Sequence, residues 1–138
     1  MGRLSDDVMD DFLGAYFGTG LLNVPSTYYI GLSQTQPTNT GTSETPPLGD
    51  GYARATYANG AAAWNGTGRT RTNANPITFP TATGNWGDLG FFTIWRSLTG
   101  TAPTDFIGWG QLDTPATVVG GGTLDFPPNA LTIDAPGT

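Results

Sequence analysis

The sequence predicts an all-β domain, an antiparallel β-sandwich or jelly-roll-like fold that follows one N-terminal amphipathic α-helix. Three observations support this fold class. Short runs of strand-forming residues recur along most of the chain and are separated by turn-forming residues. Glycine and proline are frequent, at 21 and 11 residues, and the 12% of aromatic residues can supply a core. With 138 residues the chain is long enough to form a single domain over 1–138.

The first 18 residues are predicted to form the helix, because apolar residues recur there at helical spacing on one face. Ser5 is a natural N-cap, and Gly18 is suited to the position just after the helix. Four aspartates, Asp6, Asp7, Asp10 and Asp11, lie off the apolar stripe. We interpret them as a solvated face of the helix, in preference to a calcium site or a docking site for a basic partner. We expect the stripe to be buried against the sheet or a neighbouring subunit, with the aspartates outward. The stripe comprises Leu4, Val8, Met9, Phe12, Leu13, Tyr16 and Phe17.

Short strands separated by turns are predicted after Gly18. The run at 89–96 is apolar on both faces, so it should lie at the centre of the sheet. Two Asn-Gly pairs, at 59–60 and 65–66, are typical of hairpin turns. The sequence contains about eight or nine strands at this spacing. Their expected ranges are 27–32, 52–57, 69–72, 76–79, 89–96, 106–112, 116–119, 123–126 and 130–133.

The segment at 33–51 is too long for a tight turn. It contains Pro37, Pro46 and Pro47, and its one bulky apolar residue is Leu48. Loops of this length are commonly functional or disordered. Two interpretations are open, a mobile surface loop and an extended arm that lies on a neighbouring subunit. In either case we expect the segment to become ordered only on assembly, since it has few apolar residues with which to fold on its own domain.

The chain has no cysteine, histidine or lysine, and Glu44 is its one glutamate. Thiol nucleophiles, imidazole bases, lysine Schiff bases and zinc sites made from Cys or His are therefore excluded. We expect no enzymatic activity, no catalytic residues, no cofactor and no bound metal. The net charge of −6 also argues against nucleic acid and anionic membrane as partners.

No apolar run is long enough for a transmembrane helix, and the chain shows no signal-peptide core. We therefore expect a soluble protein with no export signal.

Three further groups of residues are candidate sites. Asp105 and Asp113 lie on either side of a predicted strand and could be the carboxylate pair of a glycosidase. Both adjoin turn residues, where aspartate commonly hydrogen-bonds to its own backbone, so a role in the turns is favoured. Three of the four tryptophans lie in or beside apolar predicted strands, so we expect them to pack in the core and not to form a platform on which carbohydrate stacks. Arg69 and Arg71 share one strand face, which suits either an edge strand protected by charge or pairing with the acidic helix of another subunit.

Six motifs follow one another along the chain: YYIGLS at 28–33, GYAR at 51–54, NPITFPTAT at 75–83 with WG at 86–87, WGQL at 109–112, GTLDF at 122–126 and ALTI at 130–133. In this order they resemble a family of small virion structural proteins of tailed bacteriophages, whose members are tail-fibre-like, minor tail or capsid-associated proteins. The turn at 95–100 departs from that resemblance, because WRSLTG stands where an acidic, Gly-rich turn is expected. The family has no catalytic motif to transfer to this chain.

The resemblance implies a non-enzymatic virion structural protein. We favour a capsid cement or decoration protein on the capsid surface, which clamps neighbouring subunits and has the major capsid protein and copies of itself, as a dimer or trimer, as partners. The alternative is a tail-fibre or tail-tip domain that recognises a host surface glycan, and a carboxylate-pair glycosidase is a remote third. The candidate residues for subunit or capsid contact are Leu4, Val8, Phe12, Tyr16, Pro37, Pro46, Pro47, Leu48, Arg69 and Arg71.

Overall fold

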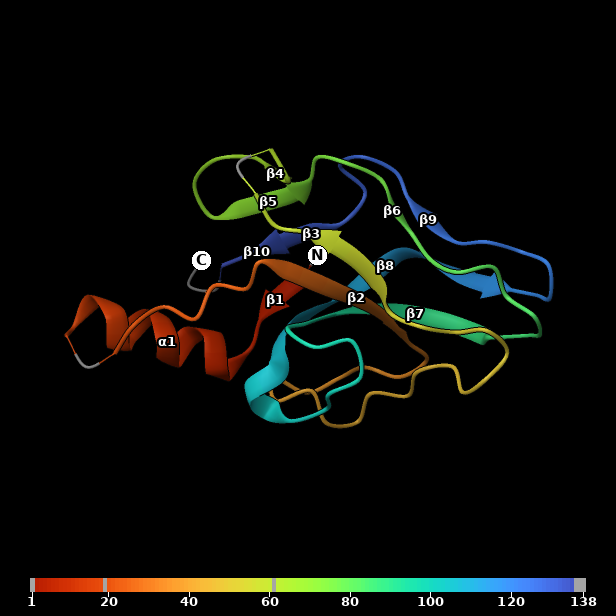
Figure 1. The fold of residues 1–138 in the computed structure, drawn as a ribbon, viewed down its shortest axis with the longest axis horizontal. Coiled ribbons are helices and arrows are strands. Elements are labelled where there is room, and N and C mark those ends of the chain that lie inside the picture. Colours follow the sequence, from red (N-terminus) through yellow and green to blue (C-terminus); the bar gives the residue numbers. More distant parts are fainter. Residues whose placement is uncertain (1, 19, 61, 136–138) are drawn as a thin grey trace.

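The computed structural model describes residues 2–18, 20–60 and 62–135 (Figure 1). The described residues form one α-helix, one 3-10 turn and two sheets, as the sequence predicts for the fold class. The elements are β1 (Gly2–Leu4), α1 (Asp6–Tyr16), β2 (Thr27–Ser33), β3 (Ala55–Ala58), β4 (Trp64–Asn65), β5 (Thr70–Asn73), β6 (Ile77–Thr78), β7 (Gly87–Trp95), η1 (Pro103–Asp105), β8 (Phe106–Val118), β9 (Asp125–Phe126) and β10 (Thr132–Asp134).

The main sheet has eight strands in the order β3-β2-β7-β8-β1-β10-β5-β4, and β6 pairs with β9 in a second, two-stranded sheet. Strand β7 lies between β2 and β8, which confirms the predicted central strand. All neighbouring strands are antiparallel except β1 and β10, which run parallel. The main sheet is therefore mixed, because the N-terminal strand inserts between β8 and β10.

The main sheet is curled, so that its two end strands approach each other. The ring of Tyr57 in β3 packs edge-on against the ring of Trp64 in β4, with 5.3 Å between centroids. The Tyr57 hydroxyl donates a hydrogen bond to the carbonyl of Ala63 and accepts one from the Asn75 backbone N–H at 3.2 Å. Side chains thus join the ends of a sheet whose end strands do not pair with each other.

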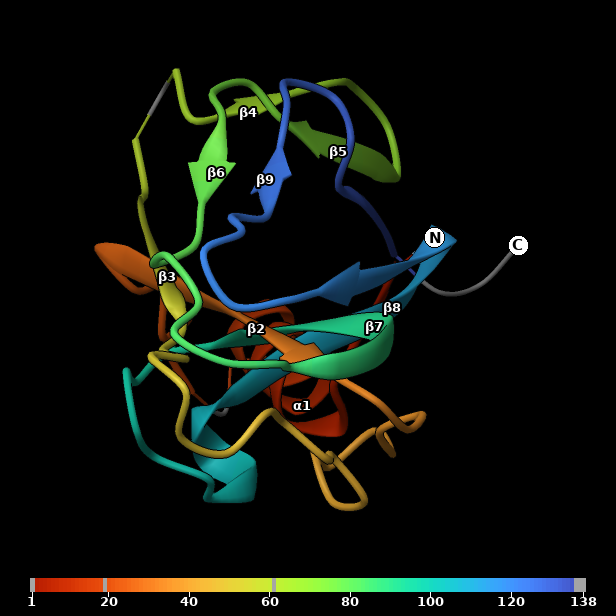
Figure 2. The same ribbon diagram turned by 90° about the vertical axis from the view of Figure 1, so that its right-hand side faces the viewer.

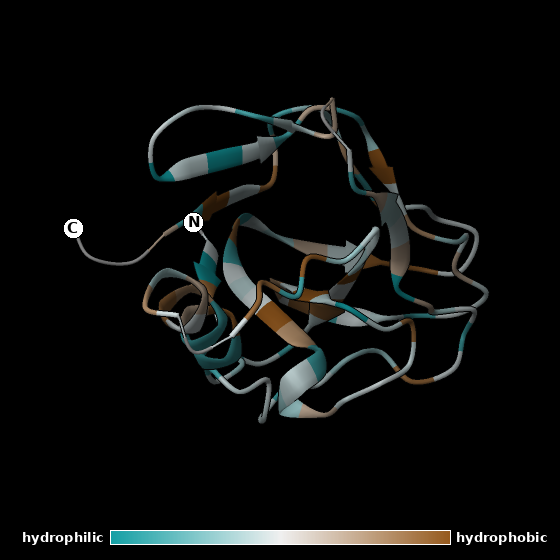
Figure 3. Ribbon diagram, turned by 60° about the vertical axis from the view of Figure 1, so that its left-hand side comes forward, coloured by the Kyte–Doolittle hydropathy of each residue, from teal (hydrophilic) through white to brown (hydrophobic). Residues whose placement is uncertain are grey.

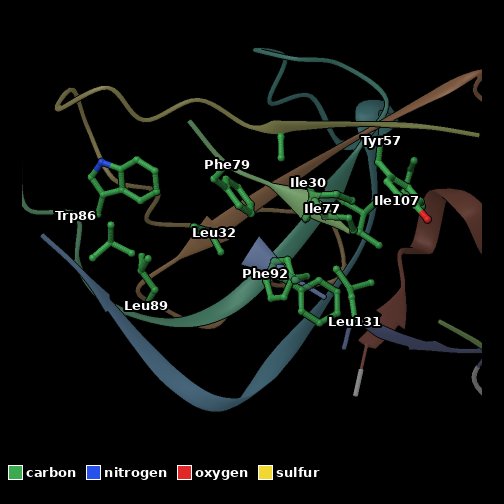
Figure 4. Packing of buried hydrophobic residues seen from close by; sticks show 14 of the residues in the cluster. Ile30, Leu32, Tyr57, Ile77, Phe79, Trp86, Leu89, Phe92, Ile107 and Leu131 are labelled. Carbon is green, nitrogen blue, oxygen red and sulfur yellow. The ribbon is translucent and has the colours of Figure 1, made fainter. Parts of the chain in front are cut away.

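The buried residues form a core between two layers. Figure 2 shows β4, β5, β6 and β9 on one side and β2, β7 and β8 on the other. The largest buried side chains come from both layers (Figure 4), because alternate residues of each strand point inward. They include Ile30, Leu32, Ile77, Phe79, Trp86, Leu89, Phe92 and Leu131.

The structure corrects the predicted N-terminal helix. The helix begins at Asp6 and not at residue 1, since residues 2–4 are strand β1 and Leu4 belongs to that strand. The predicted caps are confirmed. Ser5 accepts a hydrogen bond from the Val8 N–H, and Gly18 follows the helix with a φ of 78°.

Other parts of the strand prediction also differ from the structure. Strands predicted at 106–112 and 116–119 form one long strand, β8, that continues through Asp113 and Pro115. Its pairing with β7 is irregular, because Leu89 pairs with Ala116 whereas Phe91 pairs with Gln111. The Asn65-Gly66 pair connects antiparallel β4 and β5, as predicted. The Asn59-Gly60 pair does not form a hairpin, since β3 and β4 lie at opposite ends of the sheet order.

The 33–51 segment is folded onto its own domain, contrary to the expectation that it lacks partners. Pro37 and Pro47 are buried, and Pro46 is half-buried. Gly41 lies so close to the rings of Trp95 and Phe106 that an added Cβ would come within 2.9 Å of both. Local hydrogen bonds, such as Gln34 N–H to the Thr45 carbonyl at 2.9 Å, fold the segment back on itself. Polar contacts and buried prolines hold this loop on the domain. The small number of apolar residues in the loop did not indicate these contacts.

Candidate contact surface

The most prominent feature of the surface is an apolar area on helix α1 and the segment that follows it, called here the helix surface. Most of the exposed large apolar side chains in the described part of the chain lie in this stretch. Tyr16 is 81% exposed, Phe17 77% and Leu21 89%. The helix extends away from the sheet at the left of Figure 1, and Figure 3 shows apolar and polar colouring side by side on it. The members are Phe12, Leu13, Tyr16, Phe17, Leu21, Leu22 and Val24.

Ser5 positions this helix on the sheet. Its backbone N–H donates to the Ile107 carbonyl at 2.7 Å, and its buried hydroxyl donates to the Phe106 carbonyl at 2.7 Å. The same hydroxyl oxygen accepts from the Val8 N–H at 3.3 Å. One side chain therefore caps the helix and ties its start to β8.

Replacing Ser5 with alanine removes the cap and leaves a buried carbonyl without its donor. We expect a loss of about 2 kcal/mol in the free energy of unfolding, measured by urea denaturation. The matched control is the exposed Ser26→Ala, which should change stability by less than about 0.5 kcal/mol. Equal stability of both variants would show that Ser5 does not anchor the helix.

A double ion pair holds the helix further along. The Arg96 guanidinium at the end of β7 contacts the Asp7 carboxylate at 2.7 Å and the Asp11 carboxylate at 3.2 Å. It also donates to the Thr104 carbonyl at 2.6 Å. The prediction that the helix aspartates face outward is therefore wrong for Asp7 and Asp11, which face the sheet. Asp6 and Asp10 are exposed, as predicted.

An apolar groove lies between the helix, the 22–25 segment and the sheet. It encloses about 310 Å³, and most of its lining is apolar, with Asp11, Asn23, Arg71 and Arg96 among its polar residues. Three predicted contact residues, Leu4, Val8 and Phe12, meet here, and Arg71 reaches the same groove from β5. Leu4 and Val8 are half-buried, whereas Phe12 is 41% exposed. The protein's own sheet therefore does not bury the stripe, because the helix covers an open groove instead of a closed core. Burial against a neighbouring subunit stays a prediction.

The other predicted contact residues do not join this groove. Tyr16 lies farther along the helix surface, and Arg69 is exposed just before β5. Strand β5 is not an edge strand, since β4 lies outside it, which corrects one interpretation of Arg69 and Arg71. In the loop, Leu48 is 87% exposed, while Pro37 and Pro47 contact their own domain.

Sequence reasoning missed Leu21, Leu22, Val24 and Arg96 as parts of this site. Leu21 and Leu22 follow the helix and belong to no periodic pattern. Their hydrophobicity was therefore the one sequence signal that could have identified them as contact residues. Arg96 belongs to the turn that departs from the family pattern, and its partners are more than 80 residues away in sequence. No local signal connects it to the helix.

A buried polar cluster lies beneath the 33–51 loop. The Glu44 carboxylate accepts from the Thr93 hydroxyl at 2.9 Å and lies 3.8 Å from the Arg54 guanidinium. Arg54 stacks over the Trp95 ring at 4.1 Å and donates to the carbonyls of Ser97 and Gly100. Burial raises the pKa of Glu44, opposed by Thr93 and by Arg54, and burial lowers the pKa of Arg54. This cluster joins two loops to the core.

The Tyr52 hydroxyl adjoins that cluster and accepts a hydrogen bond from the Leu32 N–H at 2.9 Å. Desolvation raises the pKa of Tyr52 to about 12, so the phenol stays neutral at physiological pH. Its ring packs edge-on against Trp86. Tyr52 therefore contributes packing and a hydrogen bond, with no charge.

The remaining candidates separate in space. Asp105 ends η1, and Asp113 lies within β8 and not in a turn. Trp86 and Trp95 are buried, and Trp64 packs against the core, as predicted for core packing. Trp109 is half-exposed and packs edge-on against Phe91.

Within the described residues, no three His, Cys, Asp or Glu side chains gather as a metal site. In the same part of the chain, no helix has the length and apolar content to cross a membrane.

A comparison with protein families decides the wider class. The family described as podophage GP4 fiber I protein gp80 matches residues 3–134. The chain belongs to this fiber I family. It is a structural protein of the tailed-phage virion, as the order of its strand motifs implied. No curated protein sequence matches the chain.

Proposed function

We propose that this protein is a fibre subunit that attaches to another virion protein through its helix surface. The observation that carries the proposal is the concentration of exposed apolar side chains over Phe12 to Val24, continuous with the apolar groove. Such patches on soluble proteins mark interaction sites. The membership in a fiber I family supports the fibre assignment. We assign the protein a non-catalytic role, since the helix surface consists of apolar side chains suited to contact with another protein.

The chemistry of the groove describes its partner. The lining is mostly apolar, so the partner supplies one or two apolar side chains that fill about 310 Å³. Because apolar contact supplies most of the binding energy, moderate salt should release little of the protein from virions.

The attachment surface can be tested with two leucines of equal exposure. Leu22 lies on the groove and is 46% exposed, whereas Leu98 lies in the turn after β7 and is 47% exposed. Leu22→Asp should abolish incorporation into virions, since it places a charge in the apolar contact, and Leu98→Asp should leave incorporation unchanged. Both purified variants should keep their unfolding midpoints, because neither side chain is in the core.

The measurement is the amount of each variant per purified particle, determined by quantitative mass spectrometry. Normal incorporation of Leu22→Asp would refute attachment through the helix surface. Leu48→Asp changes the exposed apolar residue of the 33–51 loop. If this variant were not incorporated, the attachment surface would lie on the loop instead of the helix.

A second candidate is a capsid cement protein, which the exposed apolar helix also favours. The two roles differ in copy number and in consequence. A cement protein is present in hundreds of copies, and its loss leaves particles that rupture at lower temperature. A fibre subunit is present in few copies, and its loss lowers adsorption to the host while heat stability stays normal. Particles assembled with the Leu22→Asp variant should lack the protein, so measuring their adsorption rate and heat stability together separates the two roles.

A further inference from the structure

A second hollow lies away from the helix surface, between the irregular part of β8 and the connection from β9 to β10. This cleft encloses about 270 Å³. It exists because the ladder between β7 and β8 is interrupted. Residues 112–115 of β8 lie opposite Gly90 alone, so this stretch of strand leaves the regular pairing. The helix extends from the left of Figure 1, whereas the C-terminal part of β8 and β9 lie toward the right.

The cleft has an apolar floor and a polar rim. The floor includes Leu112, Leu124 and the edges of the Phe92 and Phe126 rings, whose centroids are 6.4 Å apart. The polar residues of its lining include Asp113, Asp125, Thr114 and Thr132. Both carboxylates are exposed, and neither has a hydrogen-bond or ion-pair partner among the described residues.

The composition of the rim restricts the ligand. No arginine lines the cleft, so an anionic ligand would meet two carboxylates without compensation. A ligand with several hydroxyl groups can donate to the carboxylates and accept from the threonine hydroxyls. Its apolar C–H face would rest on the floor. The volume lies just below the range of about 300–1,000 Å³ typical of pockets for small molecules, which suits a single ring.

We propose that this cleft binds a neutral pyranose sugar, with Asp113 and Asp125 accepting hydrogen bonds from its hydroxyl groups. The inference deepens the fibre proposal and rests on it for its biological setting, since a sugar site facing away from the attachment surface would let a fibre contact a cell-surface glycan. Binding itself is a property of the isolated protein. Failure of one proposal is therefore distinguishable from failure of the other.

The test is saturation-transfer-difference NMR of the full chain with the methyl glycosides of glucose, galactose, mannose, rhamnose and N-acetylglucosamine. At least one should give a signal, strongest for ring C–H protons. The Asp113→Ala and Asp125→Ala variants should each bind roughly tenfold more weakly, as expected for the loss of a hydrogen bond to a charged group. The control is Asp10→Ala, which removes an exposed carboxylate from the helix and should bind normally.

Absence of signal from all five sugars, or equal signals from all variants, would overturn the proposal. Binding of a trilysine peptide in place of the sugars would also overturn it and identify the rim as a simple acidic surface. Virion incorporation of Asp113→Ala should be normal in every case, because the cleft and the helix surface share no residue.

Discussion

Replacing Arg54 with alanine is expected to lower the free energy of unfolding by about 3–5 kcal/mol, because it leaves the Glu44 carboxylate buried without its counter-ion. The two side chains are 8% and 6% exposed, so water screens their interaction little. The variant also loses the hydrogen bonds to the Ser97 and Gly100 carbonyls and the stacking on Trp95. Urea denaturation at pH 7 measures the effect.

Two further variants separate charge from geometry. Arg54→Lys keeps the charge but loses the planar fork that contacts two carbonyls, so its effect should be intermediate. Arg71→Ala removes an exposed arginine and should change stability by less than about 0.5 kcal/mol. If Arg54→Ala were as stable as Arg71→Ala, the buried pair would not hold the loops.

The loss on removing Arg54 should depend on pH. Burial already raises the pKa of Glu44 above its ordinary value of 4.5, and removal of Arg54 takes away one of the influences that lower it. The folded variant therefore binds a proton at Glu44 over a pH range in which the unfolded chain does not. Stability of the variant should be greatest below this window and fall as the pH rises through the raised pKa. A cost that is the same at pH 5 and pH 8 would contradict this assignment to Glu44.

A second large effect is expected from Gly108→Ala. A Cβ at this position would lie 2.2 Å from the Arg3 carbonyl oxygen in β1, which is backbone and cannot rotate away. Gly108 pairs with Leu4, so the added methyl group should push β1 out of the sheet and release the start of the helix. Overpacking typically costs about 1–3 kcal/mol, and contact with backbone places this case at the upper end.

The matched control is Gly90→Ala on the neighbouring strand β7. An added Cβ there meets no atom within 4 Å. It should change stability by less than about 1 kcal/mol, in either direction, since only the backbone entropy of the unfolded chain changes. Hydrogen exchange of the helix amides should accelerate in Gly108→Ala and not in Gly90→Ala. Slow helix exchange in both variants would show that β1 accommodates the methyl group without releasing the helix.

Local patterns in the sequence determined the fold class, the helix caps and the central strand. The caps at Ser5 and Gly18 were predictable because a cap depends on a few neighbouring residues. The central position of β7 followed from apolar residues on both of its faces. The order of strand motifs also indicated the class of virion protein, which the family match bears out.

Tertiary structure decided the features that depend on distant partners. Strand β1 carries only three residues, and it is a strand because β8 and β10 flank it. The loop is held by Glu44, whose partner Thr93 is 49 residues away, so the scarcity of apolar residues misled the prediction of a free arm. Asp7 and Asp11 face inward because Arg96 reaches them from the turn after β7.

The candidate site shows the same division. Periodicity identified the apolar stripe of the helix and hence Leu4, Val8, Phe12 and Tyr16, because a stripe is a property of consecutive residues. Whether the protein's own sheet covers the stripe depends on where the helix leaves the domain, and that is set by the contacts of Ser5 with β8 and of Arg96 with the helix. Those contacts hold the helix beside the sheet, so the groove and the residues from Phe12 to Val24 stay open to a partner.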